Sequence, residues 1–592
     1  MNRVSAAYHR YQNCIERIVF PLILAIYPLV RIRQGIDVAD TTYSLSNFQF
    51  FASMDGTWMV ATFLANSLGS LLMHLPFGDT LLGMYCYTAL IQSLTVLVVY
   101  ETLGRSDRTT GRIPVPLVFI GELIALGLCW CPSTILYNYM TYLFMTAGIL
   151  LLYRGILKED RRYYMAAGVC LGANVAVRMP NVVQASLIVA VWYGAAVCGR
   201  KWQQAVHDTL WCIAGYVIGF GVPLAAICIK YGAGAYPAMV QTMFAMTEKA
   251  TDYKPTAMLT GMFGDYATGL YWMIFAGICM AGGFVLFTLQ RKVFPGKKGA
   301  EVLCALVYAA VLLVLLRFYW GRGMFNFLYY DFGSIYYPAV LLLLTAICAA
   351  VYCLVSKRVT TEQKILAVLM LVQILVTPLG GNNKLYPIIN NLFLALPFVL
   401  WVGYGRLKLV TGLPFALLVV FILVQSVGFH LTFSFQDGRN GEARDTLLTM
   451  PDKAAGIYTN QDNAAWLTEL AEYAQQAQLT GREVILYGEI PGLGYLLDMP
   501  PALSTFWPDL DSYRMVEYER DMEQLASPPV VIVSSSIAAY LNEDADGMNW
   551  FGVEKEKLDQ DEKLRILGEY MKAYSYQEAF GNARYVVYVT ER

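Results

Sequence analysis

Apolar runs alternate with short polar connectors along the first 430 residues of the chain. A helix needs about 20 apolar residues to cross a bilayer. The runs that approach this length lie at roughly residues 14–32, 81–100, 115–131, 134–153, 163–178, 181–198, 209–229, 267–289, 301–318, 335–355, 364–380, 388–404 and 409–430. We therefore predict an all-α polytopic membrane domain with about thirteen spanning helices.

The connectors differ in charge from one side of the predicted membrane to the other. With the N-terminus inside, every inside connector carries at least two lysines or arginines; these connectors are residues 101–112, 154–162, 199–208, 290–299, 356–364 and 403–408. The connectors of the other side are poor in bases and often long. Because basic residues concentrate on the cytoplasmic side, we predict a multi-pass cell-membrane protein with a cytoplasmic N-terminus.

The first run, Ile18–Val30, follows Arg10 and Arg17 and superficially resembles a signal peptide. No small-residue cleavage site follows it, so we expect a retained first helix.

The rest of the chain is a different kind of sequence. Short β-branched runs alternate there with helical patterns, which indicates a small α/β fold; the segments are 464–481, 482–488, 528–536, 561–574 and 583–592. An odd number of spans places this part outside the cell. We predict a transmembrane domain over residues 1–430, including an outer loop 33–80, and an extracytoplasmic α/β domain over residues 431–592.

Composition narrows the function classes. The chain is 57% hydrophobic and 15% charged, against about a quarter charged in soluble domains. Its net charge of −1 suggests no nucleic-acid partner. Its twelve cysteines form neither a disulfide framework nor a zinc pattern, and their absence from residues 431–592 fits a bacterial source. The sequence has no Walker A loop and no dinucleotide fingerprint, so any activated substrate must arrive in the membrane plane.

The outer loop 33–80 carries amphipathic stretches at 48–54 and 57–78. They are too short and interrupted to span with certainty, and they are typical of helices that lie in the membrane interface. An additional hairpin that crosses the membrane twice is the competing interpretation.

Two carboxylates near the start of this loop are candidate chemistry. Asp37 and Asp40 are three residues apart and so lie on one side of a turn or helix. A poorly solvated carboxylate can act as a general base or hold a divalent cation. The alternatives are that both are solvated loop residues, or that Asp40 caps a helix that begins at Thr41.

Three basic residues of the outer connectors are candidate anion ligands. Arg178 could pair with a lipid phosphate or serve as a helix-end anchor. Lys384 is the only base of its connector, which could bind an anion or form an ordinary turn. Arg322 flanks an aromatic loop suited to sugar stacking, although aromatic belts are normal at this depth. We expect Glu122 to face the bundle interior, and we interpret His74 and His430 as structural.

The layout resembles the GT-C superfamily of membrane glycosyltransferases, in particular the bacterial protein-mannosyltransferase-like and aminoarabinose-transferase-like families. Beyond the order of its parts, the resemblance is carried by Gly35–Phe51, by the turn Arg178–Asn181 and by the segment 485–501. It implies a sugar donor linked to polyprenyl phosphate or pyrophosphate. It also implies that an acidic residue of the first outer loop acts as catalytic base or as ligand of a divalent cation, Mg or Mn.

If these roles carry over, Asp37 or Asp40 takes the proton of the acceptor, while Arg178 and Lys384 neutralise the phosphate that leaves. We favour Asp40 as the base, because the polar and aromatic flank up to Tyr43 resembles the lining of a site. The family pattern is an adjacent or near-adjacent acidic pair, from which the spacing here departs.

The sequence thus predicts a glycosyltransferase that moves a sugar, with inversion, from a polyprenyl-phosphate donor to an extracytoplasmic glycan, lipid or protein. Two other classes stay open. A transporter or flippase of lipid-linked saccharides should show inverted repeats and polar residues at the midplane. A non-enzymatic membrane protein with an outer binding domain should tolerate the loss of both Asp37 and Asp40.

Overall fold

The computed structural model describes residue 8 and residues 10–104, 113–131, 133–246, 254–404, 407–438, 441–542 and 555–590 of the chain. The arginines of the predicted inner connector 101–112 and Arg406 of the connector 403–408 lie outside the described residues, as does Pro132 of the predicted turn 131–133.

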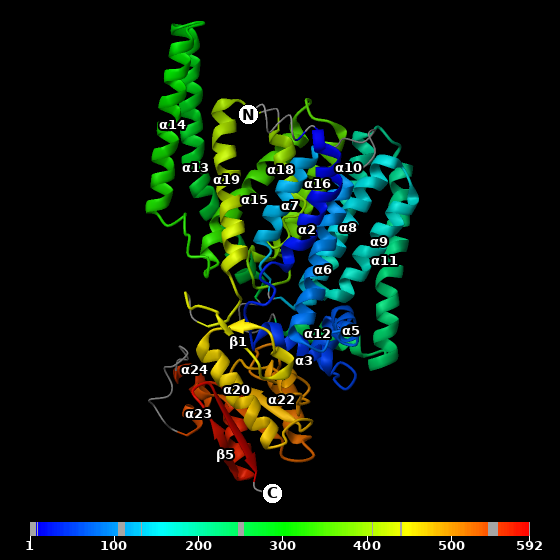
Figure 1. Ribbon diagram of the computed structural model, residues 1–592. Helices are drawn as coiled ribbons and strands as arrows, with labels where there is room; N and C mark the ends of the chain where they lie inside the picture. The colour runs from blue at the N-terminus through cyan, green and yellow to red at the C-terminus, as the bar shows by residue number, and fades with distance from the viewer. Residues whose placement is uncertain are drawn as a thin grey trace.

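Helices occupy every stretch predicted to span the membrane (Figure 1). In chain order they are η1 (Ile15–Val19), α2 (Phe20–Ile26), η2 (Tyr27–Leu29), α6 (Leu81–Val99), η3 (Tyr100–Gly104), α7 (Val115–Leu128), α8 (Leu136–Lys158), α9 (Arg161–Val177), η4 (Met179–Ile188), α10 (Val189–Val197), α11 (Trp202–Tyr231), α13 (Pro255–Val293), α14 (Lys298–Gly321), α15 (Gly333–Val355), α16 (Thr361–Val376), α17 (Tyr386–Ile389), α18 (Ala395–Gly403) and α19 (Leu409–Thr432). The mostly helical class is confirmed.

Helix length alone supports fewer than thirteen full crossings of the membrane. Within the described residues, eight helices are long and apolar enough to cross a membrane. Others, such as α7 and α16, are shorter than the roughly 20 residues of a full crossing. The figure of thirteen therefore stays a prediction.

Small residues let α9 and α11 approach closely. A Cβ built on Gly168 would lie 2.0 Å from the carbonyl oxygen of Cys212, and one on Gly215 would lie 2.0 Å from that of Met165. Apolar burial drives little helix association inside lipid, so van der Waals packing of this kind takes its place.

The outer loop 33–80 folds into three short helices at the lower end of the bundle in Figure 1, beside α12 (Ala235–Met246). They are α3 (Asp40–Gln49), α4 (Thr57–Ala61) and α5 (Phe63–Met73). At 1.5 Å per residue, the 11 residues of α5 reach only about 16 Å, half of the roughly 30 Å of a bilayer core. These lengths do not fit the alternative in which this loop crosses the membrane twice.

Residues 441–590 carry the described strands of the chain. They are β1 (Thr446–Leu447), β2 (Tyr458–Thr459), β3 (Val484–Tyr487), β4 (Val530–Ser534), β5 (Tyr576–Gly581) and β6 (Tyr585–Thr590). β1 pairs with β2, and a second sheet has the order β3-β4-β6-β5, with β3 and β4 parallel and the other pairs antiparallel. The helices of this part, which we call the tail, are η5 (Asp452–Ala454), α20 (Gln461–Gln476), α21 (Leu493–Leu496), α22 (Met515–Glu523), α23 (Ser535–Leu541), α24 (Lys555–Asp559) and α25 (Glu562–Ala573).

The tail sheet is covered on both faces. Val484 and Leu486 of β3 pack in one apolar cluster, and Ile485 and Tyr487 pack in another. Successive side chains of a strand point to opposite faces, so a strand buried on both sides reads as a continuous apolar run. This explains the uninterrupted apolar segments that predicted the strands.

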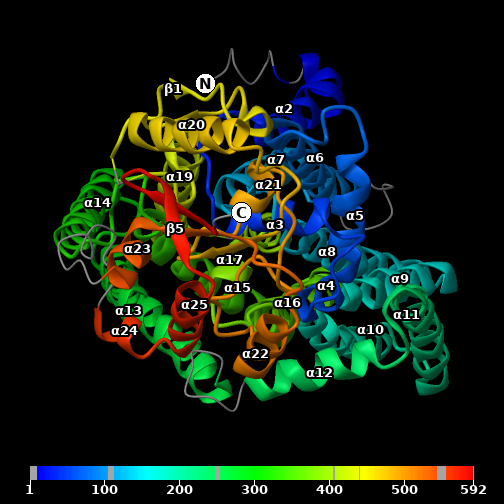
Figure 2. The same ribbon diagram turned by 90° about the horizontal axis from the view of Figure 1, so that it is seen from below.

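The start of the outer loop packs directly on the tail. Gly492 N donates to the carbonyl oxygen of Val38 at 2.8 Å, and Gly35 N donates to that of Tyr458 at 2.8 Å. Figure 2 shows α21 beside α3, and one apolar cluster contains residues of both segments, including Leu45 and Leu493. The acidic segment and the tail therefore lie in direct contact, and the charge of the connectors predicts that both are on the outer side of the membrane.

Candidate active site

Asp37 is held in a fixed orientation at the entry to α3. Its Oδ1 accepts a hydrogen bond from the backbone N–H of Ala39 at 2.8 Å, and its Oδ2 accepts one from that of Thr41 at 2.8 Å. Its backbone oxygen accepts a hydrogen bond from Thr42 Oγ1 at 2.7 Å. The side chain is 3% exposed, so both its position and its solvation are set by the fold.

Burial raises the pKa of Asp37 to about 7, with a smaller contribution in the same direction from Asp40, against the opposing effect of the two backbone N–H donors. A carboxyl group with a pKa near the operating pH is suited to general-base work. Its two accepted N–H bonds leave further lone pairs on each oxygen for an incoming proton.

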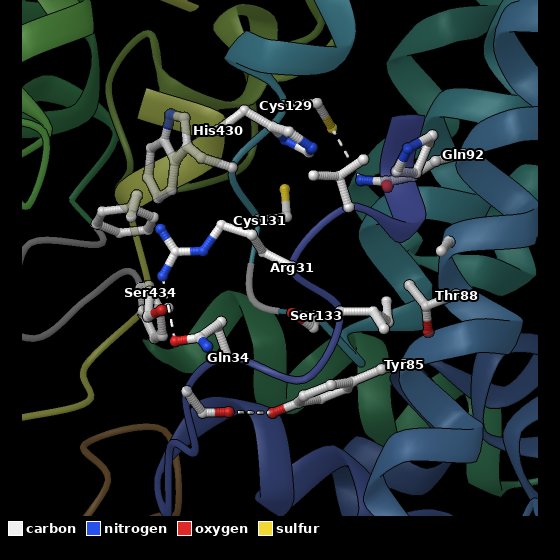
Figure 3. A pocket seen from close by; sticks show the side chains of 18 of the residues that line it. Arg31, Gln34, Tyr85, Thr88, Gln92, Cys129, Cys131, Ser133, His430 and Ser434 are labelled. Atoms are coloured by element: carbon white, nitrogen blue, oxygen red, sulfur yellow. Dashed lines mark hydrogen bonds between the residues drawn. The ribbon is translucent and has the colours of Figure 1, made fainter. Parts of the chain in front are cut away.

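Asp37 lines a cavity of about 120 Å³ at the ends of membrane helices. The walls come from segments far apart in the sequence: the chain after η2, the middle of α6, the turn after α7, the end of α19 and the residues that follow it. Polar side chains gather in it (Figure 3), and those labelled there are Arg31, Gln34, Tyr85, Thr88, Gln92, Cys129, Cys131, Ser133, His430 and Ser434.

Arg31 is the only arginine or lysine among the described residues that line this cavity. It adopts a φ of 64°, and its Nη2 donates to Oε1 of Gln34 at 3.1 Å. Burial lowers the pKa of Arg31, and the nearby Arg444 adds to the effect. A guanidinium that faces a polar cavity and has donors to spare is a strong ligand for phosphate oxygens.

Aromatic rings form one side of the cavity. Trp130 packs on Phe332 with ring centroids 4.0 Å apart and the rings tilted by 31°, and it meets Tyr386 edge-on at 4.9 Å. His430 stacks on Tyr27 at 4.2 Å, and one of its ring nitrogens lies 3.0 Å from the carbonyl oxygen of Tyr27. The cavity thus combines a carboxylate, a guanidinium and an aromatic wall.

Asp40 lies beside this cavity but does not line it. Burial raises its pKa to about 6, and the carboxylate of Glu489 in the tail adds to the effect. The helix begins at Asp40 itself, and the N–H of Thr41 is bonded by Asp37. The N-cap residue is Ala39, and the side chain of Asp37, rather than that of Asp40, accepts a hydrogen bond from the first turn of the helix.

Tyr43, the proposed site flank, faces the tail. Its hydroxyl lies 3.3 Å from Oγ1 of Thr505, and its ring meets Trp507 edge-on at 5.3 Å. It thus belongs to the contact that holds α3 on the tail.

The three basic candidates lie outside the cavity lining. Arg178 donates from Nη2 to the carbonyl oxygen of Gly380 at 3.4 Å and lies over the ring of Tyr137. The stem of Lys384 packs near Gly261. Arg322 lies over Phe318 of the preceding helix, 5.6 Å from the ring centroid. The structure brings none of the three to Asp37.

Glu122 faces the interior, as expected, at 0% exposure, and neither carboxylate oxygen has a hydrogen-bond partner within the described part of the chain. His74 bonds the carbonyl oxygen of Ser70 at 2.7 Å. The interpretation of His430 as a lone structural residue missed its place in the cavity. Only a three-dimensional arrangement joins it to Asp37, which is almost 400 residues away in the sequence.

The acidic pair alone does not make a site for Mg or Mn. Each oxygen of Asp37 accepts one backbone N–H group, and Mg is usually bound by one or two carboxylates together with waters and substrate phosphates. No three His, Cys, Asp or Glu side chains of the described ranges converge in a way that could hold a metal ion.

No known protein-family profile matches the chain, and no curated protein matches it. Among solved structures, the oligosaccharyltransferase AglB from Archaeoglobus fulgidus, in complex with an inhibitory peptide and a dolichol-phosphate, is 10% identical with a TM-score of 0.47, covering 90% of this chain and 71% of its own. A complex of the A. fulgidus oligosaccharyltransferase with Zn and sulfate is 12% identical with a TM-score of 0.46, covering 88% of this chain and 69% of its own.

ArnT from Cupriavidus metallidurans bound to undecaprenyl phosphate is 12% identical with a TM-score of 0.39, and the match covers 96% of this chain and 97% of its own. These proteins are membrane glycosyltransferases of the GT-C superfamily, the group that the sequence resembles. Every one of these TM-scores is below 0.5.

Proposed function

We propose that this chain is a membrane glycosyltransferase that moves a sugar from a polyprenyl-phosphate donor to an acceptor of the cell envelope. The observation that carries the proposal is the presence of the buried carboxylate of Asp37 and the guanidinium of Arg31 in one cavity at the ends of membrane helices. A donor of this class can leave its apolar chain in the bilayer while its phosphate and sugar reach such a cavity.

In the proposed reaction, Asp37 takes the proton of an acceptor hydroxyl as the hydroxyl oxygen attacks the anomeric carbon of the sugar. The bond from this carbon to the phosphate oxygen breaks, and the electron pair leaves with the polyprenyl phosphate. Attack opposite to the leaving group inverts the anomeric configuration. Arg31 stabilises the charge that develops on the phosphate, the role that the sequence resemblance gives to Arg178 and Lys384.

Asp37 is preferred to Asp40 as the base for two reasons. Asp37 lines the cavity, whereas Asp40 lies beside it and is repelled by the like charge of Glu489. The pKa of Asp37, raised to about 7 by burial, leaves a large ionised fraction at neutral pH and still gives the group the affinity for a proton that a base needs.

The test is donor consumption by the purified full-length protein in nanodiscs. Polyprenyl-phosphate mannose, glucose, galactose, N-acetylglucosamine and arabinose are supplied with a cell-envelope extract, and released polyprenyl phosphate is measured. We expect at least one donor to be consumed, with the rate reduced by roughly 10²-fold or more in Asp37→Asn, the order of loss for a positioned general base.

The matched control is Asp511→Asn, which changes an exposed carboxylate of the tail. It should keep the wild-type rate. Consumption of no donor by the wild-type protein, with a folded and monodisperse sample, would refute the proposed activity. An Asp37→Asn rate equal to that of the wild type would refute the role of Asp37, and transport of donor without consumption would favour the flippase alternative.

A further inference from the structure

The segment that carries Asp37 separates two cavities. Gly35 and Asp37 line the catalytic cavity, whereas Ile36 and Val38 line a second one of about 190 Å³. The second cavity therefore lies on the side of this segment away from the proposed base. Its other lining residues come from the tail and the chain that leads into it: Gln436, Gly438, Glu442, Asn460, Asp462, Asn463, Trp466, Leu467, Arg584 and Tyr585.

Asn460 gives this cavity an unused hydrogen-bond donor. Its Oδ1 caps α20 by accepting from the backbone N–H of Asn463 at 2.8 Å. Its Nδ2 has no partner among the described residues, although the side chain is only 5% exposed. A buried amide left unpaired costs about 1–3 kcal/mol, and a ligand that accepts this hydrogen bond would recover that cost.

A hydrogen-bond network behind the lining holds Asn463 in place. Asp437, which is 1% exposed, accepts a hydrogen bond from Nδ2 of Asn463 at 2.9 Å and pairs with Nε of Arg444 at 3.2 Å. Thr459 Oγ1 also donates to this carboxylate. Side chains held by such a network lose little freedom when a ligand binds, which favours affinity.

Gly438 packs closely against Asn460. It has a φ of 73°, and a Cβ at this position would lie 2.1 Å from Nδ2 of Asn460 and 2.6 Å from Oε2 of Glu442. A side chain here would therefore displace the amide of Asn460 from its present position.

The chemistry of the lining fits a hydroxyl-rich neutral ligand. Amides supply donors and acceptors, the carboxylates of Glu442 and Asp462 accept, and the guanidinium of Arg584 donates. The half-buried indole of Trp466 offers an aromatic surface for the C–H face of a sugar ring. Two carboxylates against one guanidinium disfavour an anion such as a phosphate.

We propose that this second cavity binds one saccharide unit of the acceptor, on the opposite side of the 35–38 segment from the transferred sugar. The assignment to the acceptor rests on the proposed glycosyl transfer at Asp37. Binding here would bring a glycan acceptor to the edge of the catalytic cavity and order the segment that carries the base.

The test is saturation-transfer NMR on the full-length protein in phosphatidylcholine nanodiscs free of glycolipid. The probes are the methyl glycosides of glucose, galactose, mannose and N-acetylglucosamine, with sorbitol and inorganic phosphate as negative controls. We expect at least one glycoside to bind, and Asn460→Ser, which keeps an oxygen for capping, to weaken it by about twofold to tenfold, the range for one neutral hydrogen bond. Gly438→Ala should weaken it further, because the new Cβ would displace the amide of Asn460.

Asp462→Asn changes an exposed lining residue at little risk to folding and should also weaken binding, whereas Trp202→Leu, at the far end of the bundle, should leave it unchanged. Asp37→Asn should keep glycoside binding while it loses turnover, so a failure of the proposed catalysis is distinguishable from a failure of this site. With a glycan acceptor, the cavity variants should raise the acceptor KM and leave the donor KM unchanged. Absence of glycoside binding, wild-type binding by all three cavity variants, or a change in the donor KM alone would overturn the proposal.

Discussion

The contact between Gly492 and α3 offers a steric test of how the acidic segment is held. Gly492 has ordinary helical dihedrals, φ −74° and ψ −13°, so an alanine is compatible with the backbone. However, its Cβ would lie 1.6 Å from Oγ1 of Thr42 and 2.7 Å from the carbonyl oxygen of Val38. Thr42 Oγ1 bonds the backbone oxygen of Asp37, so the clash would be transmitted to the proposed base.

The size of the effect follows from three contributions. Overpacking costs about 1–3 kcal/mol, and loss of the 2.8 Å bond from Gly492 N to Val38 costs about 0.5–1.5 kcal/mol. Replacing a glycine whose backbone conformation suits alanine offsets about 0.4–1 kcal/mol of this cost, because alanine has less conformational freedom in the unfolded chain. We expect Gly492→Ala to weaken the docking of α3 by a net of about 0.5–4 kcal/mol, which is roughly 2- to 900-fold in the docking equilibrium.

Hydrogen exchange of the α3 amides measures this equilibrium directly. Exchange through local opening should accelerate by the same factor in Gly492→Ala, and donor turnover should fall although no catalytic group is changed. The control is Gly568→Ala in α25, where the new Cβ meets only Cδ2 of Leu541 at 3.2 Å; it should leave the exchange of α3 unchanged. Wild-type protection of α3 in Gly492→Ala would refute the described contact.

Three further results are expected. Turnover should rise with pH through a half-point near 7, because burial raises the pKa of Asp37 to about 7 and the base must be ionised; a pH–rate profile with a half-point near 4, as for an ordinary carboxyl, would contradict this. Arg31→Gln should lower kcat/KM for the donor by roughly 10²- to 10³-fold, the order of loss for one group that stabilises developing negative charge, and an unchanged value in steady-state kinetics would remove Arg31 from the reaction. Asp40→Asn should keep most of the turnover and raise the melting temperature at pH 8, because the neutral amide no longer repels Glu489; a loss of activity as large as that of Asp37→Asn would return Asp40 to the role of base.

The sequence predicted best those features of the fold that depend on a local pattern of apolar and polar residues. Apolar runs located the membrane helices, because each long run must be buried in lipid. The continuous apolar segments around Val484 and Val530 predicted strands, which the structure places side by side and parallel. The same local rules placed Asp37 and Asp40 at the entry to a loop.

The site itself could not be derived in the same way. Arg31 and His430 face one cavity only because the start of the chain and the end of α19 meet in space, and no spacing in the sequence encodes that meeting. Asp40 was favoured because of its flank, yet Tyr43 of that flank packs against Trp507 of the tail. The polar and aromatic residues that follow Asp40 therefore belong to a contact between the outer loop and the tail.

The proposed reaction requires a polyprenyl-phosphate donor to enter the cavity that holds Asp37 and Arg31. A polyprenyl phosphate with a photoreactive group beside its phosphate can be crosslinked to the full-length protein, and the adducts located by peptide mass spectrometry. We expect adducts around Trp130 and His430 that unlabelled polyprenyl phosphate competes away. Competed adducts confined to other helices, with none on the cavity lining, would contradict this expectation.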